Sequence, residues 1–121
     1  MVKDLSEESA HEAAHEILKM KPKPDGLFVT NDFIAAVCMQ ELKRNGIKVP
    51  EDIAIVGFNN DAISKIIEPQ LSTIDYPGKD MGEITARNLI GHLKSVSNIN
   101  ITNRIIIKSA LIIRDSSLRK K

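Results

Sequence analysis

Two short apolar runs joined by a helical segment constrain the fold more than any other feature of the sequence. Residues 26–30 and 53–57 are apolar and rich in strand-forming side chains. Residues 33–45 between them have helical composition, and Gly46 ends that segment. Two near-continuous apolar strands connected through a helix are typical of a parallel βαβ unit. The sequence therefore predicts an α/β domain built on a parallel sheet.

Polar side chains follow each of the two predicted strands. Asn31 and Asp32 come directly after the first, and Asn59 and Asn60 after the second. Ligands of open parallel sheets bind beyond the carboxyl ends of the strands, so these residues are candidate ligand contacts. A local role explains them equally well, because Asn and Asp cap helices and Asn tolerates a left-handed backbone.

Composition excludes several classes of protein. With 17 basic and 16 acidic side chains among 121 residues, the chain has no electrostatic footprint for nucleic acid. Cys38 is the only cysteine, which rules out a disulfide framework and favours a small buried core residue. No apolar run approaches the length of a membrane span, and no export signal is visible. We therefore expect a cytoplasmic location.

The helix predicted after the first strand is apolar on all sides over residues 33–39. Such a helix must be covered on two faces. The sheet covers one face, and a second subunit is the favoured cover for the other. The chain also opens with a helix instead of a strand, which suggests a piece of a longer protein.

His11 and His15 form an H-E-x-x-H pattern with Glu12, which is the spacing of zinc proteases. The helix already has an apolar stripe, and no convincing third ligand follows. A solvated helix face is therefore the favoured interpretation over a metal site. The sequence shows no phosphate-binding glycine motif and no paired carboxylates for acid–base chemistry. We expect no enzyme activity, no metal and no cofactor.

Four segments resemble the signatures of lactose/galactose-repressor-type (LacI/GalR) transcriptional regulators. Residues 24–32, PDGLFVTND, resemble the family's PDAIFAAND, and residues 46–60, GIKVPEDIAIVGFNN, resemble its GLRVPEDVSVVGFDD. Residues 71–82 are similar to LTTVRQP followed by LG, and residues 111–116, LIIRDS, resemble LVVRES. The order and spacing agree along almost the whole chain, which makes the combination specific.

The resemblance implies that residues 1–121 form the C-terminal part of an effector-binding and dimerisation module. The implied fold is the C-terminal subdomain of a periplasmic-binding-protein-like domain, with a parallel sheet in a three-layer αβα arrangement that is incomplete here. The DNA-binding domain and most of the N-terminal subdomain have no counterpart, and residues 79–95 would belong mainly to that other subdomain. The implied function is sensing of a sugar or sugar derivative by a dimeric regulator that reaches operator DNA through its missing domain. A sugar-binding protein of a transport system is the alternative.

The resemblance also implies roles for individual residues. Asn31 would bind the effector, with Asp32 as the helix cap. Asn59 stands where the family has a ligand-binding Asp, and an amide loses the charge-assisted bond of a carboxylate but accommodates an acidic sugar. Asn60 and Tyr76 are the remaining candidates near the pocket. Residues implied at a dimer interface are Ala36, Met39, Gln40, Ile63 and Ile67.

Overall fold

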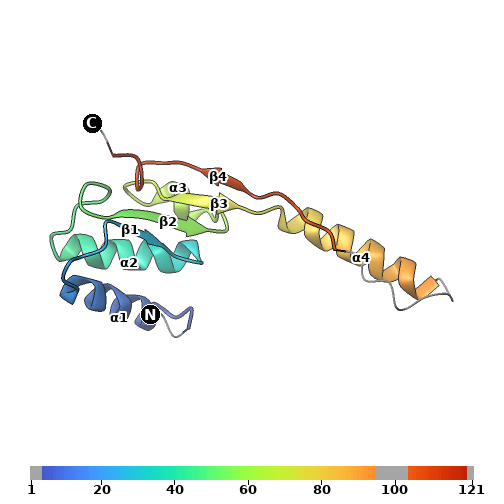
Figure 1. The fold of residues 1–121 in the computed structure, drawn as a ribbon, viewed down its shortest axis with the longest axis horizontal. Helices are drawn as coiled ribbons and strands as arrows, with labels where there is room; N and C mark the ends of the chain where they lie inside the picture. Colours follow the sequence, from blue (N-terminus) through green and yellow to red (C-terminus); the bar gives the residue numbers. More distant parts are fainter. Residues whose placement is uncertain (1–3, 95–103, 120–121) are drawn as a thin grey trace. The chain divides into compact units, whose positions relative to one another are not determined.

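The computed structural model describes residues 4–94 and 104–119. The chain divides into two compact units (Figure 1). The first contains Met1–Asp75 and Ala110–Lys121, and the second contains Tyr76–Ser109.

The first unit is a four-stranded sheet with three helices. The strands run in the order β1-β2-β3-β4; β1, β2 and β3 are parallel, and β4 is antiparallel to β3. The predicted parallel α/β architecture is confirmed. The elements are α1 (Glu7–Lys19), β1 (Gly26–Phe28), α2 (Asp32–Arg44), β2 (Ala54–Phe58), α3 (Ile63–Ile66), β3 (Ser72–Asp75) and β4 (Ala110–Ile112).

Helix α2 lies at the centre of the packing. Its Ala35, Met39 and Leu42 are fully buried in one core cluster with side chains of the strands. The alanines at positions 10 and 14 of α1 are also fully buried, and they allow α1 to pack closely on α2. The predicted need for a second subunit over α2 is therefore wrong, because α1 and α3 of the same chain cover it.

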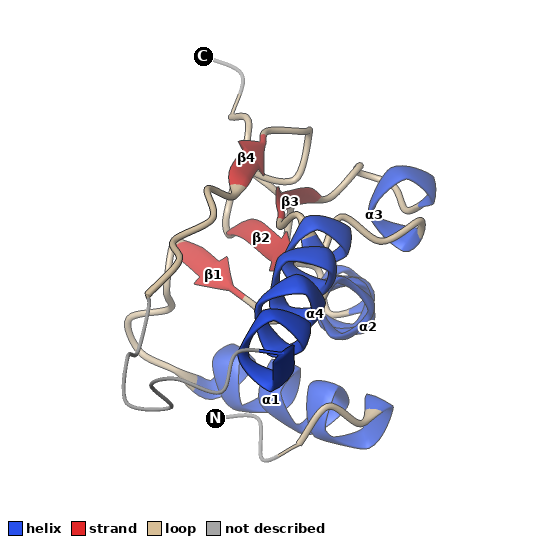
Figure 2. Ribbon diagram, turned by 90° about the vertical axis from the view of Figure 1, so that its right-hand side faces the viewer, coloured by secondary structure: helices blue, strands red, loops and turns tan. Residues whose placement is uncertain are grey.

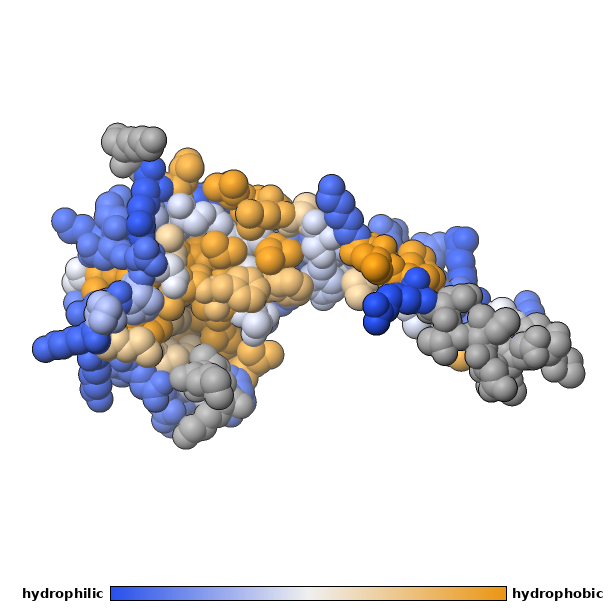
Figure 3. Space-filling model, in the orientation of Figure 1, coloured by the Kyte–Doolittle hydropathy of each residue, from blue (hydrophilic) through white to orange (hydrophobic). Residues whose placement is uncertain are grey.

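The helices of the first unit lie on one side of its sheet (Figure 2). A second helical layer, expected for a three-layer arrangement, has no counterpart among the described elements of this unit. Figure 3 shows apolar side chains gathered over the opposite face of the sheet. Large exposed apolar residues of this unit include Phe28, Leu111 and Ile113, with exposed fractions of 58%, 60% and 62%.

The second unit contains the long helix α4 (Gly78–Lys94). The sequence pattern of residues 79–95 predicts this helix with an offset of one residue. None of its described side chains is buried. Met81, Ile84 and Leu89 line a shallow groove with Ile105 and Ile107. The isoleucine-rich runs at residues 104–108 and 111–114 each favour a strand in the sequence. The first forms none, and the second contributes to the short strand β4. The largely polar segment 95–103, for which the sequence favours a loop, lies outside the described residues.

No helix in the described part of the chain combines the length and the apolarity that a membrane span requires.

Candidate functional site

The carboxyl ends of β1 and β2 bring two polar loops to one edge of the sheet. Phe28 is paired with Val56 in the parallel register, and Asn31 and Asn59 each follow three residues later. The two loops are bonded directly, because the backbone N–H of Asp61 donates to Asp32 Oδ2 over 2.8 Å. The predicted meeting of residues 31 and 32 with residues 59 and 60 at this edge is thus present, and Asp61 supplies the bond between the loops.

Asn31 caps helix α2. Its Oδ1 accepts a hydrogen bond from the backbone N–H of Ile34 at 3.1 Å, and its backbone is extended with φ of −153°. The cap is therefore Asn31 and not Asp32, which corrects the prediction. The cap uses the amide oxygen of this half-buried side chain. Its role in ligand binding stays a prediction.

Asp32 is fully buried at the first position of α2. Its Oδ1 accepts from the hydroxyl of Thr73 at 2.6 Å, and its Oδ2 accepts from Asp61. Both oxygens are thus bonded to the protein, which corrects the prediction of a direct ligand contact. A buried charge is stable only with such partners, and the positive end of the helix dipole adds to them. Asp32 supports the loop that follows β2.

Asn59 and Asn60 both have a positive φ, 117° and 56° respectively. Asparagine tolerates such a backbone, as expected from the sequence, and two consecutive asparagines adopt it here. The backbone N–H of Asn60 donates to the Thr73 hydroxyl, and its side-chain oxygen accepts from Arg114 Nη2 at 2.9 Å. Asn60 is therefore turned toward the protein. Asn59 is half-buried, and its Nδ2 lies 3.4 Å from a carboxylate oxygen of Asp61.

Three residues at this edge were not among the predicted site residues: Gly57, Thr73 and Arg114. A Cβ at Gly57 would lie 2.1 Å from Asp32 Oδ1, so only glycine permits the approach of the carboxylate. Arg114 also donates to the Leu71 carbonyl at 2.7 Å. Gly57, Thr73 and Arg114 all stand within the motifs that carry the family resemblance, which is the signal that could have identified them.

The predicted pocket residue Tyr76 opens the second unit and is 38% exposed. Its ring lies beside Gly78, whose added Cβ would be 3.0 Å from the ring edge. Its contact with an effector stays a prediction.

The predicted dimer residues divide into two groups. Ala36, Met39 and Ile67 are 4%, 0% and 7% exposed, so their side chains have little or no surface left for a second subunit. Gln40 and Ile63 line a surface groove between α2 and α3.

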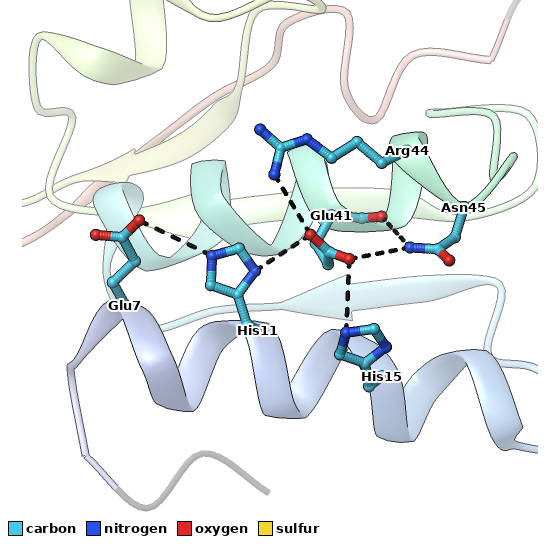
Figure 4. A network of polar contacts seen from close by, with 6 residues as sticks. All are labelled: Glu7, His11, His15, Glu41, Arg44 and Asn45. Atoms are coloured by element: carbon cyan, nitrogen blue, oxygen red, sulfur yellow. Dashed lines mark hydrogen bonds and ion pairs between the residues drawn. The ribbon is translucent and has the colours of Figure 1, made fainter.

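His11 and His15 face helix α2, as Figure 4 shows. The Nδ1 of His11 lies 3.2 Å from Glu41 Oε2, and the Nε2 of His15 lies 3.6 Å from Glu41 Oε1. The favoured interpretation of a solvated face is therefore incomplete, because both rings bridge two helices. Within residues 4–94 and 104–119, no three His, Cys, Asp or Glu side chains are grouped to hold a metal ion. We call Glu7, His11, His15, Glu41, Arg44 and Asn45 the Glu41 cluster.

Two titratable groups of α2 have shifted pKa values. Partial burial raises the pKa of Glu41, but the Asn45 hydrogen bond and the two imidazoles outweigh it and hold the pKa below the ordinary value. Burial raises the pKa of the Cys38 thiol to about 11, as expected for an inert core cysteine.

An apolar groove of about 350 Å³ lies between α1, β1 and α2. It is lined by side chains such as Ile17, Leu27 and Cys38, and neither Asn31 nor Asn59 contributes to its lining. The polar edge and this groove are therefore separate features of the first unit.

Comparison with known proteins places the chain in a family. A model of the periplasmic binding protein-like domain matches residues 2–117. The chain therefore belongs to the periplasmic binding protein-like domain family.

The similar proteins are transcriptional regulators, which confirms the resemblance to LacI/GalR-type regulators. The NTD biosynthesis operon regulator NtdR of Bacillus subtilis is 38% identical over 105 residues, which cover 85% of this chain and 31% of the regulator. The ribose operon repressor of the same organism is 39% identical over 90 residues, which cover 74% of this chain and 28% of the repressor. The structure of the transcriptional regulator CelR in complex with cellobiose superposes with a TM-score of 0.83 at 26% identity, over 94% of this chain and 34% of that one. The chain thus spans about a third of the length of these relatives.

Proposed function

We propose that this chain is the C-terminal part of the effector-binding module of a LacI/GalR-type transcriptional regulator. Its role is to bind a small molecule at the polar edge of the sheet and to change the DNA affinity of the regulator through linkage. The observation that carries the proposal is the hydrogen bond between the loop after β1 and the loop after β2. These loops lie at the edge where parallel sheets bind ligands. DNA contact, and with it a cytoplasmic location, is a property of the whole regulator.

The effector is a sugar or sugar derivative. The relatives include a ribose operon repressor and a regulator in complex with cellobiose. Asn31 and Asn59 are the proposed effector contacts at the polar edge of the first unit. The contact predicted for Tyr76 from the family resemblance is kept as a separate proposal. An amide at position 59 both donates and accepts hydrogen bonds, which suits hydroxyl groups and tolerates a ligand carboxylate.

The helix predicted over 79–95 belongs to the other subdomain of the module in this proposal. The division of the chain into two compact units, with α4 in the second, supports that assignment. The absence of buried side chains on the described part of α4 is consistent with a helix that packs on a segment of another subdomain.

The regulator acts as a homodimer in this proposal. Gln40 and Ile63 line a groove between α2 and α3 beside Ile66, which is 77% exposed. Isoleucines and charged side chains line this groove together, and protein interfaces combine apolar and polar surface in this way. Replacement of Ile66 by Asp should convert a dimer to a monomer in sedimentation, and replacement of the equally exposed Leu93 by Asp should not.

A thermal-shift titration tests the proposed function. Ribose, cellobiose and gluconate are added to the chain, and a cognate ligand at about 100 times its dissociation constant should add about 2.7 kcal/mol of stability. Replacement of Asn59 by Gly, which tolerates the positive φ of 117°, should abolish the shift and leave the unliganded midpoint nearly unchanged. A chain that discriminates among duplex DNA sequences by itself would contradict the proposal, because no DNA-binding unit is expected in it.

A further inference from the structure

We propose that Asp32 is a positioning residue that holds the loop Asn59–Asp61 in its left-handed conformation and so presents Asn59 to the effector. This inference rests on the proposed function for the last step only. The holding of the loop is a property of the unliganded chain and is tested separately.

The loop has a backbone that needs external support. Asn59 and Asn60 have φ values of 117° and 56°, and residues with a Cβ rarely adopt such values. Two such residues in succession persist only when the surroundings determine them.

One carboxylate orients two consecutive backbone N–H groups of the loop. Asp32 Oδ2 accepts directly from Asp61 at 2.8 Å. Its Oδ1 accepts from the Thr73 hydroxyl at 2.6 Å, and because that hydroxyl donates to Asp32, its oxygen is left to accept from the N–H of Asn60 at 3.2 Å. We call Asp32, Thr73, Asn60, Asp61 and Arg114 the Asp32 network.

The network is closed to solvent at its centre. Asp32 and Thr73 are both fully buried, and Gly57 has no side chain to separate the carboxylate from β2. A buried carboxylate is costly unless every oxygen is bonded, and an apolar side chain would avoid that cost. The loop bonds give the charge a role that an apolar side chain could not perform.

Arg114, which follows β4 in the chain, holds the same loop through a hydrogen bond. Its Nη2 donates to the side-chain oxygen of Asn60, and its Nη1 donates to the Leu71 carbonyl and lies 3.1 Å from the Ser64 hydroxyl. With the side chain of Asn60 held by Arg114 and its N–H held by Thr73, the neighbouring Asn59 is the member of the pair that remains for a ligand.

The experiment measures amide hydrogen exchange of the 121-residue chain, residue by residue, in three variants. Asp32→Ala removes both acceptors and should speed exchange at Asp61 and Asn60 by about tenfold relative to core amides such as Ile55. Thr73→Val is nearly isosteric and should speed exchange at Asn60 while Asp61 stays protected. Asp52→Ala is the matched control, because Asp52 also bonds a backbone N–H, that of Lys48, at 2.8 Å, away from the loop.

A ligand measurement completes the test, with ribose, cellobiose and gluconate as probes. The affinity for a probe that binds the unaltered chain should fall about tenfold in Asp32→Ala and Thr73→Val, and should not change in Asp52→Ala. Equal exchange of Asp61 and Asn60 in Asp32→Ala and in the control overturns the positioning role. Faster exchange without any probe binding supports the holding of the loop and counts against the proposed function instead.

Discussion

Helix α2 carries two carboxylates in opposite surroundings. Asp32, at its first position, is fully buried and bonded to two neutral donors from other elements. Glu41, near its last turn, has a side chain 13% exposed and is paired with the titratable rings of His11 and His15. The helix dipole stabilises the first carboxylate and opposes the second. The comparison teaches that burial and the kind of partner, more than the number of contacts, decide whether a carboxylate shapes a site.

The largest expected effect is the loss of stability when a side chain is placed at Gly57, beside the Asp32 carboxylate. Gly57→Ala should destabilise the chain by about 3 kcal/mol, because its Cβ would collide with Asp32 Oδ1 and press on a Leu71 methyl group at 3.0 Å. The control is Gly26→Ala in β1, where the new Cβ meets only a carbonyl oxygen at 3.9 Å and the change should stay within about 1 kcal/mol. Urea unfolding midpoints of the two variants compare them, and equal midpoints would contradict the close approach of Asp32 to β2.

Direct removal of the two carboxylates tests the comparison itself. Asp32→Ala should cost about 2 kcal/mol in the free energy of unfolding, because it leaves the buried Thr73 hydroxyl without its acceptor and breaks the part-buried bond from the Asp61 N–H. Glu41→Ala should cost clearly less, because its partners regain water. Chemical denaturation of both variants at neutral pH measures the difference. If Glu41→Ala proves the more damaging, the contrast between the two ends of α2 fails.

Two substitutions of Asn31 distinguish its role as the cap of α2 from its proposed role in ligand binding. Asn31→Ala should destabilise the chain by about 1 kcal/mol through loss of the bond to Ile34. Asn31→Asp keeps an accepting oxygen and should retain that stability, yet it removes the amide N–H₂ that a ligand would use. Thermal midpoints with and without a bound sugar distinguish the variants. Normal binding by Asn31→Asp would reduce Asn31 to a cap alone.

The smallest effect is the pH response of the Glu41 cluster. The folded-state pKa of Glu41 is lowered, so the stability it contributes is present above the ordinary value of 4.5 and is lost as the pH falls through the folded-state pKa. The midpoint difference between the unaltered chain and Glu41→Gln should therefore shrink below pH 4.5. Denaturation at a series of pH values from 3 to 8 measures it, and a difference independent of pH would show that the cluster contributes no electrostatic stability.

The sequence predicted the main strands and helices, but it did not predict the contacts between residues that are distant in the chain. The apolar runs before Asn31 and Asn59 predicted β1 and β2, and the apolar segment between them predicted α2. The patterns could not show that Asp32 bonds Thr73, which lies 41 positions away, or that Arg114 reaches Asn60 from 54 positions away. Such contacts depend on which strands become neighbours and in which register.

The incorrect prediction that a second subunit covers α2 has a related cause. Its all-round apolar surface correctly indicated two covered faces, but the choice of cover depended on the small side chains of Ala10 and Ala14 in α1. A periodic pattern shows that a face is buried and does not name its partner.

The sequence by itself determined the parallel α/β class and the set of amide-bearing loops beyond β1 and β2, because strand and helix periodicity and turn residues act over a few positions. Only the tertiary structure decided that Asn31 is the cap, that Asp32 is buried beneath the loop and that Arg114 holds Asn60. The cap is a local hydrogen bond, for which the sequence pattern offered both Asn31 and Asp32. The other two outcomes follow from the strand order and register of the sheet, which bring Thr73 within hydrogen-bond distance of Asp32 and Arg114 within that distance of Asn60.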